Sequence, residues 1–175
     1  MKSALLIIDV QRGLFEPEPQ PYDAQAVVER INQVSAAARG HDVPVIFIQH
    51  ERSDMLYGSE AWQLHLGLAV CEGDHIVRKT TPDSFLNTSL STLLQTLGVG
   101  QLVICGFASE FCVDTSTRRA AALGYPVTLV ADAHTTHDKA HASGAQIRQH
   151  ENATLCDITS FGPEIRALPA ADIRF

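Results

Sequence analysis

The stretch QLVICGFASEFCVDT, residues 101 to 115, decides the fold class and contains the first candidate for chemistry. Its first half is an apolar run typical of a buried strand, and its second half begins a segment with helical periodicity. Cys112 is therefore predicted on the first turn of a helix, just past the end of a strand. Leu or Ala would serve packing equally well there, so the thiol needs a reason of its own.

Short apolar runs alternate with longer amphipathic segments along the whole chain. Buried strands are predicted at 4–10, 43–49, 101–106, 126–132 and 153–158, with a shorter one at 75–79. Helices are predicted at 23–40, 84–98 and 111–124, each ending at a glycine, with a less regular one at 137–151. This alternation predicts a single domain over residues 1–175 with a three-layer α/β/α fold. Its mostly parallel sheet has about six strands and helices on both faces.

Composition excludes several classes of protein. The net charge of −7, with no Lys/Arg cluster to offset it, argues against a nucleic-acid surface. The opening run MKSALLIIDV is too short for a signal sequence or a membrane span, so we expect a cytoplasmic protein that binds no membrane. The four cysteines, at 71, 105, 112 and 156, show no CxxC spacing, and disulfides are not expected. Cys105 and Cys156 lie in strand-like runs and are predicted to be small buried hydrophobes.

Polar residues at the ends of strands are the candidates for a site, because ligands of parallel α/β sheets bind beyond the carboxyl ends of the strands. Asp9 closes an apolar strand and needs a donor or a cation, since an unpaired buried charge is unfavourable. A structural acceptor is the alternative. Lys79 ends the run at 75–79, and its alternative is an ordinary exposed lysine. The other strand ends are His50 with Glu51, the 106–112 loop and the 132–137 segment.

Cys112 has the clearest local argument for reactivity. A helix N-terminus presents free N–H groups and a partial positive charge, which together predict a lowered pKa for the thiol. The same N–H groups are suited to an oxyanion on a substrate carbonyl. A nucleophilic thiol also needs a base that takes its proton and returns it to the leaving group. The alternative is a further buried cysteine without chemistry.

Together these segments resemble the isochorismatase-like cysteine hydrolase superfamily. The resemblance rests on LLIIDVQ, VIFIQH, a lysine some thirty residues further on, GFASEFCV and VTLVADA, in that order from about Ala4 to Ile158. The most specific piece is the G-x-x-[ST]-x-x-C-V pattern formed by Gly106, Ser109, Cys112 and Val113.

The resemblance implies a catalytic triad. Cys112 would be the nucleophile, Asp9 the general base, and Lys79 the cation that stabilises the thiolate beside a carboxylate. It also implies a non-proline cis peptide between Phe107 and Ala108, with the N–H groups of Ala108 and Cys112 forming an oxyanion hole.

The cysteine also separates two chemistries within the superfamily. Members that carry it act mostly on amides, ureides and carbamoyl compounds, so the resemblance implies hydrolysis of a non-peptide C–N bond through a thioester, without a cofactor. Nicotinamidases of the superfamily bind a metal through an Asp-x-His pair and a second histidine. Here His50 and Glu51 are adjacent and point to opposite faces of a strand, which is a poor chelate, although His65 offers an imidazole. No metal is therefore expected.

Several other residues are candidates for the substrate pocket or for a structural role. The pocket candidates are Gln11, Phe15, His50, Trp62 and Ser109, with Tyr57 and Phe107 as further aromatic residues. The histidines of DAHTTHDKAH suggest a metal cluster, but a solvated helix entry with Asp138 near its N-terminus is the preferred interpretation. The resemblance implies a homodimer or homotetramer that takes a small amide-type molecule. A non-catalytic assembly domain and a thiol redox protein are the alternatives.

Overall fold

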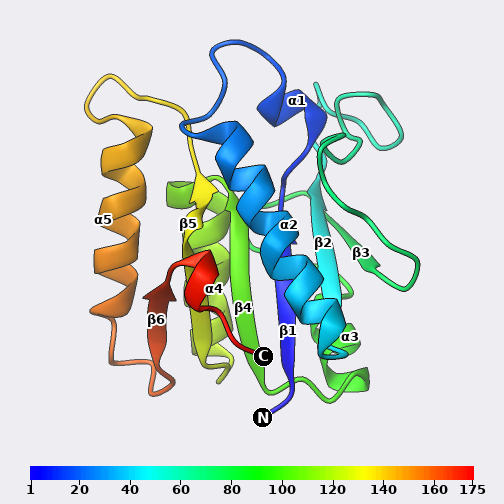
Figure 1. Ribbon diagram of the computed structural model, residues 1–175, viewed down its shortest axis with the longest axis vertical. Coiled ribbons are helices and arrows are strands. Elements are labelled where there is room, and N and C mark those ends of the chain that lie inside the picture. Colours follow the sequence, from blue (N-terminus) through cyan, green and yellow to red (C-terminus); the bar gives the residue numbers. More distant parts are fainter.

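A computed structural model describes all 175 residues and shows one parallel sheet of six strands in the order β3-β2-β1-β4-β5-β6 (Figure 1). The strands are β1 (Ser3–Ile8), β2 (Val45–His50), β3 (His75–Lys79), β4 (Gln101–Phe107), β5 (Val127–Thr135) and β6 (Ile165–Leu168). The chain builds outward from β1 to β3 and then returns to the other side of β1. The strand order therefore reverses between β1 and β4, which is where such sheets bind ligands.

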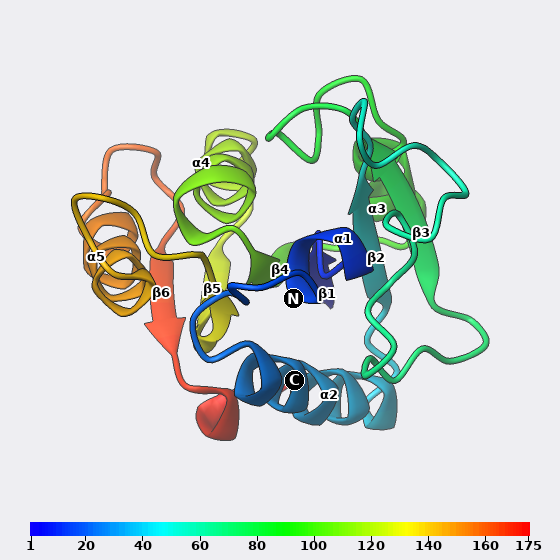
Figure 2. The ribbon, with the colours of Figure 1, turned by 90° about the horizontal axis from the view of Figure 1, so that it is seen from above.

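Helices cover both faces of this sheet, as Figure 2 shows from above. One face packs against α2 (Ala24–Gly40) and the short C-terminal helix η2 (Ala170–Asp172). The other face carries α3 (Leu90–Thr96), α4 (Asp114–Ala122) and α5 (Gly144–Cys156). The single turn α1 (Arg12–Phe15) lies above the carboxyl end of β1. The predicted three-layer α/β/α fold is confirmed.

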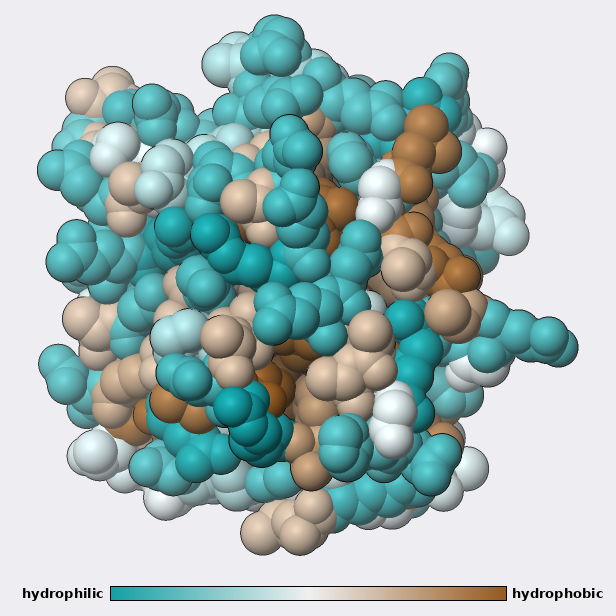
Figure 3. All heavy atoms as spheres, viewed as in Figure 1, coloured by the Kyte–Doolittle hydropathy of each residue, from teal (hydrophilic) through white to brown (hydrophobic).

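Alternate residues of each central strand enter different cores, because successive side chains of a strand point to opposite faces. In β1, Leu5 and Ile7 pack with α2, whereas Leu6 and Ile8 pack with α3 and α4, and all four are at most 1% exposed. Double-sided burial explains why the central strands read as unbroken apolar runs. The surface over α2 is mostly hydrophilic, with apolar residues in small groups (Figure 3). None of the helices combines the length and apolarity needed to span a lipid bilayer.

The prediction for residues 153–158 is wrong: this run is the end of α5, not a strand. A capping box begins that helix, with the Ser143 hydroxyl accepting from the Gln146 N–H while the Gln146 side chain accepts from the Ser143 N–H. Ile147, Glu151 and Leu155 are its buried stripe, one turn apart. Cys156 therefore ends a helix and is half-buried, and the sixth strand is β6, which the prediction missed.

Two helix boundaries also differ from the prediction. The helix predicted at 84–98 is regular only in α3, and the one predicted at 137–151 begins at Gly144. Asp138 nonetheless serves that helix, because its Oδ1 accepts from the Gly144 N–H at 2.7 Å. The glycine stops are confirmed at Gly98 and Gly124, which have φ angles of 68° and 95°.

Candidate active site

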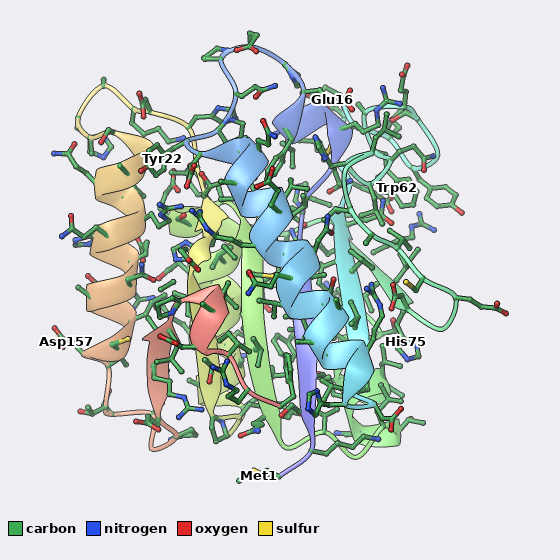
Figure 4. The ribbon with its side chains drawn as sticks, viewed as in Figure 1. Met1, Glu16, Tyr22, Trp62, His75 and Asp157 are labelled. Carbon is green, nitrogen blue, oxygen red and sulfur yellow. The ribbon has the colours of Figure 1, made fainter.

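Three neighbouring strands deliver charged or polar groups to the same rim of the sheet. Asp9 follows β1 directly, and its φ of 53° lies in the left-handed region that aspartate tolerates. His50 and Lys79 are the last residues of β2 and β3 and are partners in the strand register. Their side chains therefore leave the sheet on the same face, side by side. Figure 4 shows Glu16 and Trp62 at this end of the molecule and Met1 at the opposite end.

The fourth strand brings the thiol. β4 pairs with β1 so that Gly106 lies opposite Ile8, one residue before Asp9. Gly106 has a φ of 121°, and a Cβ there would lie 2.1 Å from the Ile8 carbonyl oxygen, so only glycine fits. The Phe107–Ala108 peptide is cis, as the resemblance implied, and the π-helical turn η1 (Ser109–Val113) carries Cys112 into α4.

The predicted Asp9, Lys79 and Cys112 meet at this rim. Lys79 Nζ donates to Asp9 Oδ2 at 2.7 Å and to Cys112 Sγ at 3.3 Å. It also contacts His50 Nδ1 at 2.8 Å. Asp9 and Lys79 are 1% and 2% exposed, so water does not screen their ion pair. Asp9 Oδ1 is buried and has no hydrogen-bond partner, which leaves one carboxylate oxygen free to accept a proton.

The prediction of a lowered thiol pKa is wrong. Burial, followed by the charge of Asp9, raises the pKa of Cys112 to about 12, and Lys79 only partly offsets this increase. The resting group is therefore a thiol, and the helix terminus does not decide its ionisation. A neutral thiol beside a carboxylate with a free oxygen is an arrangement in which the proton leaves as the sulfur reacts, not before.

The donor atoms of a metal site are present, but their centre is occupied. Asp9, His50 and Cys112 offer an oxygen, a nitrogen and a sulfur within 4.8 Å of one another. The Lys79 ammonium contacts all three residues, so a side-chain cation already lies among them. Glu51 points away and pairs with Arg78.

His65, the second imidazole considered as a metal ligand, does not belong to the group formed by Asp9, His50 and Cys112. Burial lowers the pKa of His65, whose ring packs against Phe15 with 5.7 Å between the ring centroids. Its Nδ1 accepts from the Gly67 N–H at 3.1 Å. The nicotinamidase ligand pattern is therefore not formed by His50, Glu51 and His65.

Most of the predicted pocket residues are buried in the packing around the site. Gln11 and Ser109 are fully buried, Phe15 is 1% exposed and Trp62 is 8% exposed. Gln11 Nε2 donates to the backbone carbonyls of His50 and Trp62, and Gln11 Oε1 accepts from the His50 N–H. These side chains hold the segments that form the rim. Of the predicted set, only His50 is half-buried and reaches the reacting cluster.

A cavity of about 440 Å³ opens beside the cis peptide. Most of its wall comes from residues that were not predicted to line a pocket. Among them are Leu14, Arg52, Phe111, His137 and Lys139, which lie beside Phe107 and Ala108. Phe111 directly precedes the cysteine and is 52% exposed, and this neighbour position was the one sequence signal that pointed to it.

The histidine-rich segment is not a simple solvated helix entry. His134 is fully buried, and its Nδ1 and Nε2 lie 2.8 Å from Ser109 Oγ and 2.9 Å from Asn152 Oδ1. Asn152 Nδ2 donates to the Ala131 carbonyl, so its Oδ1 must accept and His134 Nε2 must carry the hydrogen. Ser109 then donates to His134 Nδ1, and this chain of hydrogen bonds ties the start of η1 to β5 and α5.

Comparison with known proteins identifies the family, since the model of the isochorismatase domain matches residues 3–160. The chain belongs to the isochorismatase family. A solved isochorismatase family protein is 38% identical and superimposes with a TM-score of 0.88, covering 95% of this chain and 97% of the other. An N-carbamoylsarcosine amidase from Thermoplasma acidophilum is 18% identical with a TM-score of 0.82 over 100% of both chains, which shows the shared fold.

Among curated relatives, a streptothricin hydrolase from Streptomyces noursei is 36% identical over 138 residues. That match covers 77% of this chain and 50% of the relative. A second streptothricin hydrolase from the same organism is matched over 57% of its length. This chain thus spans about half the length of the curated relatives it matches.

Proposed function

We propose that this protein hydrolyses a non-peptide C–N bond of a small amide, ureide or carbamoyl compound, with Cys112 as the nucleophile. The observation that carries the proposal is the contact of one buried ammonium, Lys79 Nζ, with both Asp9 Oδ2 and Cys112 Sγ. A thiol, a carboxylate with a free oxygen and a cation are the groups that a thioester mechanism requires. Asp9 and Cys112 follow β1 and β4, between which the strand order of the sheet reverses, and the Lys79 ammonium reaches them from the end of β3.

In the first step, the sulfur of Cys112 attacks the substrate carbonyl carbon while Asp9 Oδ1 takes the thiol proton. Lys79 stabilises the negative charge as it moves from the carboxylate to the sulfur and the carbonyl oxygen. Ala108 is 2% exposed and its N–H donates to no backbone carbonyl, so this N–H is free to hold that oxygen together with the Cys112 N–H. Because the pKa of Cys112 is raised, proton transfer has to accompany attack.

In the following steps, Asp9 returns the proton to the departing nitrogen, and the C–N bond breaks to leave a thioester on Cys112. Water then attacks the thioester carbonyl while Asp9 accepts one of its protons. The carboxylic or carbamic acid leaves, and the thiol is restored with that proton. Every proton and electron pair is accounted for by side chains and water.

The names of related proteins support this class of reaction. Streptothricin hydrolase and N-carbamoylsarcosine amidase are both named for hydrolysis, the second at an amide-type bond. The wall of the cavity beside the cis peptide offers apolar surface, from Leu14 and Phe111, and charge of both signs, from Arg52, Lys139 and Glu18, which suits a polar substrate of modest size.

The arrangement of the thiols favours hydrolysis over thiol redox chemistry. A redox pair needs a resolving cysteine beside the reactive one. Cys105 is fully buried and packs in the core beneath α2, whereas Cys112 packs against the core on the opposite face of the sheet. The strand therefore separates the two sulfurs.

A screen for ammonia or amine release over primary amides, ureides and carbamoyl compounds tests the proposal. The Cys112→Ala variant runs beside the wild-type protein, with folding checked by circular dichroism. Turnover that survives in this variant would refute the nucleophile assignment. The homodimer or homotetramer expected from the resemblance stays a prediction, which sedimentation of the same preparation tests.

A further inference from the structure

The three N–H donors of the Lys79 ammonium are matched by three acceptor atoms around it. An ammonium group carries three N–H bonds and no acceptor. Its three neighbours are Asp9 Oδ2 at 2.7 Å, His50 Nδ1 at 2.8 Å and Cys112 Sγ at 3.3 Å. The Lys79 side chain is 0% exposed, so water does not supply a further acceptor. Each N–H is thus committed to one side chain, and His50 holds one of the three.

This contact fixes the chemical state of His50. A nitrogen that faces an ammonium donor at 2.8 Å has to present a lone pair, so the imidazole is neutral and carries its hydrogen on Nε2. A protonated ring would place two positive charges in contact inside a site that excludes water. The neutral ring and the charged lysine are therefore mutually dependent.

Rigid elements hold the two groups in register. His50 and Lys79 are paired residues of β2 and β3, and the Glu51 N–H donates to the Lys79 carbonyl at 2.8 Å. Gln11 clamps the His50 backbone from the other side, accepting from its N–H and donating to its carbonyl. A side chain held this firmly is suited to positioning a neighbour.

We propose that His50 is a positioning residue, whose neutral imidazole holds the Lys79 ammonium against the thiol of Cys112 and the carboxylate of Asp9. Without that acceptor, one N–H of a buried ammonium has no partner, and Nζ turns toward the stronger carboxylate and away from the sulfur. The reaction then loses the cation that stabilises charge on the sulfur. This inference deepens the proposed function and rests on it for its kinetic consequence.

Three substitutions separate positioning from direct contact with substrate. In His50→Asn, the amide oxygen occupies about the place of Nδ1 and accepts from Lys79. In His50→Gln, the amide group lies one carbon further out, near the place of Nε2, and His50→Ala offers no acceptor. We expect kcat to stay within about tenfold of wild type in His50→Asn and to fall about a hundredfold in the other two variants. KM should change by less than about threefold in all variants, since binding is not lost.

The pH profile gives a readout that a merely structural role would not change. Burial, then the charge of Lys79, lowers the pKa of His50, while Asp9 and a hydrogen bond with the Thr81 backbone oppose that shift and Arg52 reinforces it. Wild-type kcat/KM should therefore lose activity on the acid side as the ring becomes protonated below the usual histidine range. His50→Asn has no titrating ring, so the part of the acid limb that protonation of this ring causes should disappear. An acid limb that persists unchanged in His50→Asn would overturn the inference.

Alkylation of Cys112 by iodoacetamide, followed by peptide mapping, tests the same contact without any substrate. The labelling rate should remain near wild type in His50→Asn and fall about tenfold or more in His50→Gln, a variant of matched polarity that guards against a misfolded His50→Ala. If labelling follows this order while no amide is hydrolysed, the positioning role stands and the proposed function fails. If Asn, Gln and Ala variants label and turn over alike, or if only KM rises, His50 does not position Lys79 and the inference is refuted.

Discussion

Cys105 and Cys112 lie seven positions apart in the sequence and occupy opposite kinds of surroundings. Cys105 sits in the middle of β4, fully buried, and its thiol donates only to the Leu6 carbonyl at 3.6 Å. Cys112 lies on η1 within reach of Asp9 and Lys79. Burial raises the pKa of both thiols. The two cysteines therefore do not differ by one being a thiolate at rest. They differ because a carboxylate and an ammonium lie beside the sulfur of Cys112, and neither lies beside the sulfur of Cys105.

Removing each thiol in turn is the most direct test of whether the surroundings of Cys105 and Cys112 differ in function. Cys112→Ala should abolish turnover, by about ten-thousand-fold or more, because the covalent intermediate cannot form. The matched control is Cys105→Ala, which should leave kcat/KM unchanged and destabilise the fold by about 1–2 kcal/mol through a small cavity. Initial rates of ammonia release and urea unfolding curves measure the two effects. Equal losses of activity in both variants would show that the two environments are not functionally distinct.

Gly106 connects the two regions, and its replacement should have the next largest effect. In Gly106→Ala the new Cβ meets the Ile8 backbone, and φ is strained as well. We expect a loss of about 4 kcal/mol or more in the free energy of unfolding, or failure to fold. Gly40→Ala is the control, because nothing lies within 4 Å of a Cβ there and the residue is helical. A normal melting temperature for Gly106→Ala would contradict the assigned backbone geometry.

Removing the charge of Asp9 should move reactivity and turnover in opposite directions. Asp9→Asn removes the proton acceptor, so turnover should fall about 10²–10⁴-fold. It also removes an anion that raises the pKa of Cys112, so labelling of this thiol by iodoacetamide at pH 7–8 should become faster. Asp157→Asn, at the far end of α5 in Figure 4, is the control and should change neither rate. Slower labelling in Asp9→Asn would mean that Asp9 does not act on the thiol in this way.

A smaller effect concerns the pH dependence of folding stability, which the buried His134 on β5 should influence. The pKa of His134 is lowered to about 4, mainly by burial, so folding favours the neutral ring. The contribution of the neutral ring to the free energy of unfolding is fully present above the unfolded-state pKa of about 6.5. It is lost as pH falls through about 4, and the loss amounts to at most about 3 kcal/mol. Urea unfolding at pH 7 and pH 4.5 should show a larger loss for wild type than for His134→Gln. Identical losses in the two proteins would contradict a buried neutral His134.

Much of the fold could be predicted because its sequence signals are local. Apolar runs of strand length, amphipathic segments and glycine stops reflect backbone and burial preferences that neighbouring residues express together. The one wrongly predicted element, 153–158, shows the limit of such local signals. A short apolar run ending a helix looks like a strand, and the Ser143–Gln146 capping box ten residues upstream decides between them.

The location of the site in the fold could be predicted, but the burial of its residues and the lining of its cavity could not. The rule that parallel strands present ligands at their carboxyl ends led to Asp9, His50, Lys79 and Cys112. It did not say that Gln11 and Ser109 lie under the rim, nor that Phe111 and Lys139 line the cavity. Those facts depend on how loops fold over one another, and no short sequence window carries that information.

By itself, the sequence determined the alternation of strands and helices and the rim on which the polar residues end. Only the tertiary structure decided that Lys79, 70 residues from Asp9, completes an ion pair beside the thiol and that the pKa of Cys112 rises. The physical reason is that burial and Coulomb forces depend on distances in space. Groups far apart in the chain set those distances, and local preference does not.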